Sequence, residues 1–250
     1  MTSPVRIAFL GGNGHCAARL AAARPFLDEI DLDEVPYPGF EGRPRAGSRE
    51  EFLSAISEHL RRTAPAMIYA TGIGGLLALC LRARGELVGT PLLLQAPILW
   101  GLEHRWLPRL MRFGWARRGM GKVFATPAFQ RRFAAKYFTH PPSPGVLADF
   151  FAGYAQCAAA ADLFAWFDPP LLRSLERDLV ARTGALDEVQ VWWGGRDRVV
   201  TLRELEWTRE ALALGDRWPV RVFPEWGHYP MIDDPAGWAR ELIRAVAAAG

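Results

Sequence analysis

Lysine is nearly absent from this chain of 250 residues, where it occurs only at Lys122 and Lys136. Arginine therefore supplies almost all of the positive charge, and the formal net charge is only +3. This use of arginine, together with abundant alanine, fits the codon bias of a GC-rich genome better than it fits a surface for nucleic acid. We therefore expect no nucleic-acid partner.

Cysteine is also scarce, and no two cysteines have the spacing of a metal site. The three cysteines, Cys16, Cys80 and Cys157, are odd in number and far apart, which favours a reducing cytoplasm. No pair of histidines has metal-ligand spacing, so we expect no metal and no cofactor. The N-terminus shows no charged leader with a long apolar core, and no apolar run reaches membrane-spanning length. These absences predict a cytoplasmic protein without a membrane span.

The residues that are present alternate between strand-like and helix-like segments. Short apolar runs predict strands at 5–10, 30–35, 66–70, 90–98, 189–195 and 220–227, and helical patterns predict helices at 17–23, 48–62, 74–85, 202–214 and 235–249. The predicted strands are continuously apolar, which is typical of a parallel sheet with both faces buried. The sequence therefore predicts an α/β fold with a mostly parallel sheet flanked by helices.

This alternation stops between about residues 100 and 183, where the sequence becomes aromatic and helical in composition. We expect an inserted helical lid at 100–183 and a core formed by 1–99 and 184–250. Residues 101–140 carry nine basic residues and one acid, a net charge of +8. This charge fits either a solvated face or a surface for an acidic partner or anionic substrate. The aromatic residues fit either the interior of the lid or an apolar pocket, with Trp100 as a candidate substrate contact.

The stretch "ATGIGG" at 70–75 follows a predicted buried strand and opens a predicted helix. A sharp turn of this kind normally presents a nucleophile, but Gly72 occupies that position. Glycine tolerates a strained backbone and supplies no side-chain oxygen. Thr71 is one step early in the turn, and Cys80 lies about two helical turns beyond it, so neither is a good substitute. Cys16 remains an open but less favoured alternative to the missing nucleophile.

Four motifs in this order resemble the α/β-hydrolase superfamily over essentially the whole chain. "FLGGNGH" at 9–15 resembles the oxyanion loop, with Gly11 in place of the usual histidine. "ATGIGG" resembles the G-x-S-x-G-G elbow, "WWGGRDRVV" the turn that carries the acid, and "PEWGHYPMIDDP" the loop that carries the histidine.

This resemblance implies a catalytic pair formed by His228 and Asp197, with Gly72 at the position of the nucleophile. It also implies an oxyanion hole formed by the backbone amides of Asn13 and Ile73. His15, close to the oxyanion loop, is a further candidate substrate contact, although a surface or capping histidine is the simpler interpretation.

The sequence therefore predicts an enzyme that has an α/β-hydrolase fold but lacks a serine nucleophile. Its expected chemistry is acid/base catalysis, either of lyase or cyclase type or hydrolysis through an activated water. The expected substrate is a hydrophobic carbonyl compound, aromatic or bound to a carrier. Two alternatives stay open: a ligand-binding protein without catalysis, and a serine esterase inactivated by a serine-to-glycine change.

Overall fold

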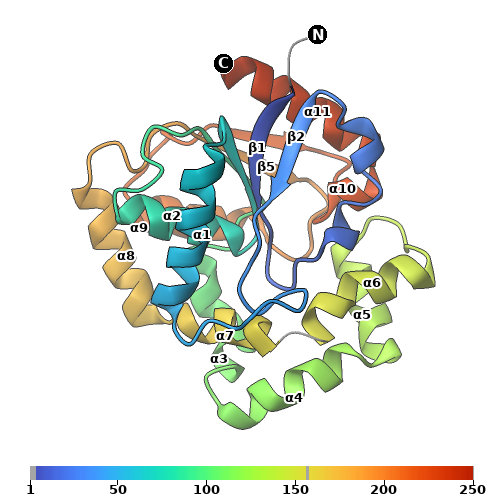
Figure 1. Cartoon of the computed structure of the whole chain (residues 1–250). Coiled ribbons are helices and arrows are strands. Elements are labelled where there is room, and N and C mark those ends of the chain that lie inside the picture. The colour runs from blue at the N-terminus through green and yellow to red at the C-terminus, as the bar shows by residue number, and fades with distance from the viewer. Residues whose placement is uncertain (1–3, 156–157, 250) are drawn as a thin grey trace.

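A single sheet of six parallel strands forms the centre of the molecule (Figure 1). The computed structural model describes residues 4–155 and 158–249. The strands are β1 (Val5–Leu10), β2 (Ile30–Glu34), β3 (Met67–Thr71), β4 (Leu92–Gln95), β5 (Val189–Gly194) and β6 (Val220–Phe223). Their spatial order is β2-β1-β3-β4-β5-β6, and each neighbouring pair is parallel. The predicted parallel α/β fold is confirmed, and all strands end at the same edge of the sheet.

Helices flank this sheet, as the alternating sequence pattern predicts. They are α1 (Arg49–Thr63), α2 (Gly74–Ala83), α8 (Pro169–Ala181), α9 (Leu202–Ala211), α10 (Pro230–Asp233) and α11 (Pro235–Ala249). Helix α2 packs against both α1 and α8. Helix α11 places Trp238 against Tyr69 of β3, with 5.7 Å between the ring centroids. No helix within the described ranges is long and apolar enough to cross a membrane.

The chain between β4 and β5 is helical. Before α8 it forms η3 (Trp100–His104), α3 (Trp106–Leu110), α4 (Gly114–Phe124), α5 (Pro127–Tyr137), α6 (Pro144–Ala155) and α7 (Ala158–Trp166). Helices α3 to α7 gather at one end of the molecule, away from α11 (Figure 1). The ring of Phe124 holds α4 to α5 and α6, because it contacts Phe129 at 4.9 Å and Tyr154 at 4.6 Å.

Helix α8 behaves differently from the helices that precede it. It packs against α2, and just after its end Arg182 Nε donates a hydrogen bond of 2.9 Å to the carbonyl oxygen of Ala83. Because α8 packs against a helix of the core, the domain boundary at 183 stays a prediction, and the helices that form a separate group are α3 to α7.

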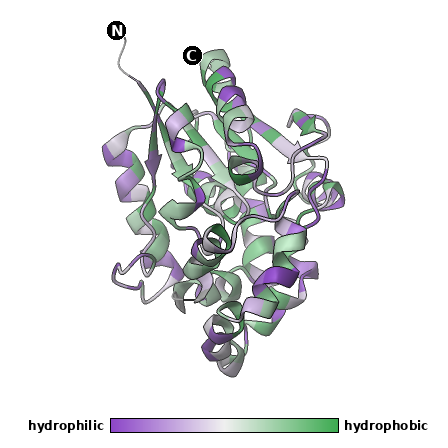
Figure 2. Cartoon of the chain, turned by 90° about the vertical axis from the view of Figure 1, so that its right-hand side faces the viewer, coloured by the Kyte–Doolittle hydropathy of each residue, from purple (hydrophilic) through white to green (hydrophobic). Residues whose placement is uncertain are grey.

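Figure 2 shows apolar residues on the central strands, whereas hydrophilic residues occur mainly on outer helices and loops.

Residues 17–23 do not form the predicted α-helix. The structure has only the 3₁₀ turn η1 (Ala17–Arg19), followed by a second such turn, η2 (Arg24–Phe26). The available length is about two α-helical turns before Pro25, too short to be stable without a packed face. The side chain of Arg19 is buried instead of lying on a helix surface. Strand β6 is also shorter than predicted, since it ends before Pro224, which cannot donate to the sheet.

Candidate active site

The turn after β3 has the backbone of a nucleophile elbow. Gly72 has a φ of +53°, in the left-handed region that favours glycine. Two residues later, α2 begins at Gly74, where a Cβ atom would lie 2.2 Å from the carbonyl oxygen of Leu10. The helix can therefore approach β1 this closely only because Gly74 has no side chain.

A side chain at position 72 would have room. A Cβ atom built on Gly72 would meet only the Gly12 Cα at 3.6 Å and the Ile98 Cδ1 at 3.9 Å. Thr71 is not available as a replacement nucleophile, because its Oγ1 accepts a 2.9 Å hydrogen bond from the Gly12 amide. The space normally filled by a nucleophile is therefore open to a water molecule or to a substrate atom.

His228 and Asp197 form a hydrogen-bonded pair beside this turn. Asp197 follows β5 and His228 follows β6, so the parallel sheet brings both to the edge where β3 ends. The His228 Nδ1 lies 2.8 Å from the Asp197 Oδ2, and the Asp197 side chain is completely buried. The other carboxylate oxygen, Oδ1, accepts hydrogen bonds from the amides of Val199 and Val200 at 2.7 and 2.9 Å. These contacts fix the ring through Nδ1, and Nε2 has no hydrogen-bond partner among the described residues. A general acid or base requires such an arrangement.

The predicted oxyanion hole consists of the backbone amides of Asn13 and Ile73. Both residues line the same cavity as Gly72 and His228. Neither amide has a hydrogen-bond acceptor among the residues that the structure describes. A backbone amide without an acceptor can stabilise a developing negative charge on an oxygen bound within hydrogen-bond distance, so the oxyanion hole stays a prediction.

This active-site cavity has a volume of about 390 Å³. Its aromatic walls come mainly from the helical segment and include Trp106, Phe133, Tyr137, Tyr154 and Phe164; it also contains the charged side chains of Arg105, Lys136, Arg198 and Glu204. Arg105 and Glu204 form an ion pair with each other at 2.7 Å. Lys136 and Arg198 have no ion pair among the described residues, so the cavity carries an excess of positive charge.

Two tyrosines in this cavity are not identified by the sequence motifs. Tyr137 on α5 and Tyr154 on α6 are 8% and 5% exposed, and neither hydroxyl has a hydrogen-bond partner within 4–155 and 158–249. The ring centroid of Tyr137 lies 5.6 Å from that of His228. Burial raises the pKa of Tyr137 well above its ordinary value, so the hydroxyl is a neutral donor. In the sequence, both tyrosines have the same helical spacing as the aromatic residues that form the interior of the segment, so the pattern did not distinguish them.

Arg19 is a third residue whose role the sequence did not reveal. It is 2% exposed and donates hydrogen bonds to the carbonyl oxygens of Asn13 and Phe150 and to the Tyr229 hydroxyl, at 3.0 to 3.1 Å. Its guanidinium also lies 4.1 Å from the centroid of the Phe150 ring. It forms no ion pair with any described carboxylate. Arg19 thus joins the oxyanion loop, the residue after His228 and helix α6.

His15 and Trp100 do not lie among the described residues that line the active-site cavity. The His15 ring fills the space beside Gly11, where a Cβ atom would lie 2.2 Å from the His15 Cγ, and its Nε2 lies 2.9 Å from the Glu34 Oε2. Burial lowers the pKa of His15 to about 3, so its ring is neutral. Trp100 is buried in η3. The structure supports a packing role for both, and their predicted substrate contacts remain untested.

Neither of the two described cysteines supplies a nucleophile to the cavity. Cys16 and Cys80 are free thiols that lie outside its described lining. Burial raises the pKa of Cys80 to about 12, which keeps that thiol protonated and unreactive. Cys157 lies outside the described residues.

Comparison with known proteins agrees with the parallel α/β fold. The alpha/beta hydrolase family model matches residues 9–241. No curated protein matches the chain. The similar solved structures include a haloalkane dehalogenase from Bradyrhizobium elkani, at 18% identity and a TM-score of 0.69, covering 100% of this chain and 92% of that one. They also include a bacterial membrane phospholipase A, at 22% identity and a TM-score of 0.64, covering 100% of this chain and 80% of that one.

At these identities the solved structures establish the fold alone, whereas the family model extends over nearly the whole sequence. The matched residues include the oxyanion loop, the elbow, Asp197 and His228. This protein belongs to the alpha/beta hydrolase family.

Proposed function

We propose that this protein is an enzyme that performs acid/base chemistry on a hydrophobic carbonyl compound, without a covalent intermediate at the elbow. One observation carries the proposal. A single cavity contains a histidine paired with a buried aspartate, two amides without acceptors, and an elbow position that has open space in place of a side chain. A histidine with a free Nε2 can act as base and then as acid within one reaction.

One route is hydrolysis through water. His228 Nε2 takes a proton from a water molecule in the space beside Gly72, while the water oxygen forms a bond to the substrate carbonyl carbon. The electron pair of the carbonyl double bond moves to its oxygen, which the amides of Asn13 and Ile73 stabilise. When this oxyanion collapses, the leaving group departs and takes the proton from His228.

The second route, of lyase or cyclase type, uses the same groups. His228 takes a proton from the carbon next to the substrate carbonyl, and the electron pair of that bond forms an enolate. The enolate oxygen is stabilised by the amides of Asn13 and Ile73, and the open space at Gly72 admits the substrate itself. In the lyase case the enolate electron pair expels a leaving group from the β-carbon, and that group takes the proton from His228. In the cyclase case the enolate carbon forms a ring bond to a second carbonyl carbon, whose oxygen takes the electron pair of its double bond and the proton from His228. In both routes, the Tyr137 hydroxyl is a donor for a second polar group of the substrate.

The lining of the cavity supports a substrate that is hydrophobic and bears an anionic end. Phe133 and Phe164 supply apolar ring surfaces, and Lys136 and Arg198 supply positive charge that no described carboxylate pairs with. An aromatic acyl group attached to an acidic carrier has both features. The alternative is a protein that binds such a ligand without catalysis. The absence of a nucleophile at Gly72 favours this alternative.

The test compares His228→Ala with the wild type on aromatic thioesters and β-keto thioesters. Hydrolysis is followed by mass spectrometry, and exchange of the α-proton by NMR in deuterium oxide. We expect His228→Ala to lower turnover by about 100-fold or more, because general acid/base catalysis contributes at this scale. His140→Ala, which removes an exposed histidine, should retain wild-type turnover.

Unchanged turnover in His228→Ala would contradict the acid/base proposal. Binding of these compounds by both proteins without any turnover would support the non-catalytic alternative.

A further inference from the structure

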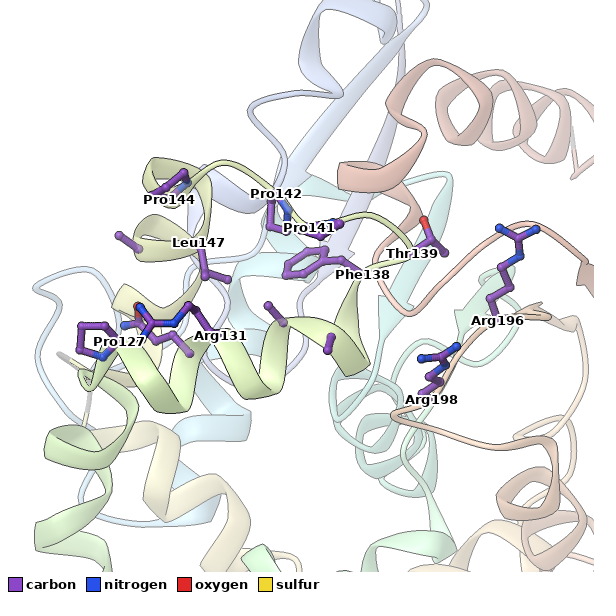
Figure 3. A pocket seen from close by; sticks show the side chains of 14 residues that line it. Pro127, Arg131, Phe138, Thr139, Pro141, Pro142, Pro144, Leu147, Arg196 and Arg198 are labelled. Atoms are coloured by element: carbon purple, nitrogen blue, oxygen red, sulfur yellow. The ribbon is translucent and has the colours of Figure 1, made fainter.

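A second hollow lies beside the active-site cavity, on the outer side of α5. It has a volume of about 1000 Å³ and is formed by α5, the loop 138–143, the start of α6 and the turn after β5 (Figure 3). We refer to this hollow as the outer groove. Its lining residues differ from those of the active-site cavity, and among the described residues only Arg198 lines both. The outer groove is therefore a neighbouring site rather than part of the same cavity.

The outer groove combines an apolar body with arginines. Its floor contains Ala134 and Phe138, which are buried, and one wall is formed by three prolines at 141, 142 and 144. Proline rings fix the backbone angle φ, so this wall is already rigid before any ligand binds. The charged residues that line the groove are Arg131, Arg196 and Arg198, and no described aspartate or glutamate lines it.

The turn that positions Asp197 also presents the two arginines next to it. The Asp197 side chain points inward to His228, held by the amides of Val199 and Val200. Arg196 and Arg198 are exposed and lie together at one end of the outer groove (Figure 3). Arg198 has no ion pair among the described residues. Arg196 pairs with Glu225, but both side chains are largely exposed, and an exposed pair of this kind is weak enough to exchange for a ligand.

From these features we infer that the outer groove binds a free single-chain anionic amphiphile, such as a long-chain carboxylate. The apolar chain lies along Ala134, Phe138 and Leu147, and the anionic group lies between Arg196 and Arg198. A guanidinium binds a carboxylate through charge-assisted hydrogen bonds, which gives this end of the groove its specificity. The volume lies within the range of small-molecule sites. This inference goes beyond the proposed function and does not depend on chemistry at His228.

The test measures the fluorescence of dansylaminoundecanoic acid, an anionic chain whose emission rises in an apolar site, during titration with the full-length protein. We expect saturable binding, with the uncharged methyl ester of the same probe weaker by roughly tenfold or more, because it cannot form the charge-assisted contacts. The double variant Arg196→Gln and Arg198→Gln should weaken binding of the acid by a similar factor and leave binding of the ester unchanged.

Two further variants locate the probe. Ala135→Trp, on an exposed part of α5, fills the outer groove and should lower the affinity at least tenfold. Leu107→Trp fills the active-site cavity and should leave the affinity unchanged. Arg132→Gln removes an exposed arginine of α5 that does not line the groove, so it is the charge control for the double variant and should leave the affinity for the acid unchanged. Circular dichroism and melting temperature establish that each variant is folded.

Three results would overturn the inference. One is equal affinity for the acid and its ester. Another is loss of binding in Leu107→Trp but not in Ala135→Trp, which would place the probe in the active-site cavity. The last is binding of the probe only when it is embedded in lipid vesicles, which would indicate a membrane surface in place of a free amphiphile. None of these measurements uses turnover, so failure here and failure of the proposed catalysis are distinguishable.

Discussion

Gly72 keeps the backbone geometry of the elbow but lacks the side chain that usually acts as the nucleophile. Its φ of +53° is the strained conformation in which a nucleophile is normally held, yet glycine adopts it without steric penalty. The neighbouring residue Ile73, whose amide has no acceptor among the described residues, lines the same cavity. The backbone part of the site can therefore be tested independently by returning a hydroxyl to this position.

We predict that Gly72→Ser gains covalent labelling by a fluorophosphonate probe, because the new hydroxyl has space and lies beside His228 and the free amides. The same variant should lower the free energy of unfolding by about 1 kcal/mol, since a non-glycine residue is strained at positive φ. Labelling is measured by intact-protein mass spectrometry, and stability by urea unfolding.

Gly119→Ser is the matched control for this experiment. Gly119 lies within α4 at a negative φ, and a Cβ atom there would meet nothing within 4 Å. The control should not be labelled and should not lose stability. A Gly72→Ser protein that resists the probe would contradict the assigned positions of the elbow and the oxyanion hole.

His15 determines a second residue-scale property, the dependence of stability on pH. Burial lowers its pKa to about 3 in the folded protein, against 6.5 for the free group. Between these two values the unfolded chain binds a proton that the folded chain does not bind. The contribution of His15 to stability is therefore present above pH 6.5 and is lost as the pH falls towards 3.

We expect His15→Gln to reduce the slope of unfolding free energy against pH in this window, by up to about 1.4 kcal/mol per pH unit. Urea unfolding at several pH values between 4 and 7 measures the slope. His140→Gln, at an exposed site, should leave the slope unchanged. An unaltered slope in His15→Gln would mean that the His15 ring is protonated in the folded state.

At the scale of elements, helix α1 has a favourable cap at its start and a strained residue at its end. Its start agrees with the sequence: the Ser48 side chain accepts a hydrogen bond from the Glu51 amide at 3.2 Å. Its end departs from the preferred chemistry, because Ala64 has a left-handed conformation with a φ of 44°. Glycine is the residue that usually ends a helix in this conformation.

We predict that Ala64→Gly raises the free energy of unfolding by about 0.5 kcal/mol or more, because it relieves the strain of alanine at positive φ. Ala55→Gly, on the exposed middle of the same helix, should lower it by about 1 kcal/mol. The two identical substitutions should therefore have opposite signs in urea unfolding. Equal losses would show that Ala64 is not strained.

At the scale of the whole molecule, Arg19 links parts that are distant in the sequence. It contacts the oxyanion loop at Asn13, the loop of His228 at Tyr229, and α6 at Phe150. Its charge is buried, has no carboxylate partner in the part of the chain that the structure describes, and is compensated by carbonyl oxygens and aromatic faces. The Arg19 side chain therefore fixes both the position of α6 and the orientation of the Asn13 peptide.

We predict that Arg19→Met lowers the free energy of unfolding by about 2–4 kcal/mol, because it leaves buried oxygen atoms without donors. It should also increase cleavage by limited proteolysis within residues 106–155, since α6 loses its contacts with the core. Arg118→Met, at an exposed position of α4, is the control and should change neither. Unchanged proteolysis in Arg19→Met would argue against a role in holding α6.

The sequence predicted the parts of the fold that local patterns encode. The strand at Val5–Leu10, the cap at Ser48 and the turn around Gly72 each depend on residues within a few positions of one another. The prediction of a helix at 17–23 was wrong for the converse reason. There, a long-range contact of the Arg19 side chain outweighed the local helical composition.

The amino-acid sequence by itself determined the order of the elements, the family, and the absence of a side chain at the elbow. It determined these because chain order, turn chemistry and apolar periodicity are local properties. Only the tertiary structure decided which side chains surround His228, among them the unpartnered Tyr137, and that His15 packs against Gly11 outside the cavity. These contacts join residues far apart in the chain, and three-dimensional packing alone sets which of them meet.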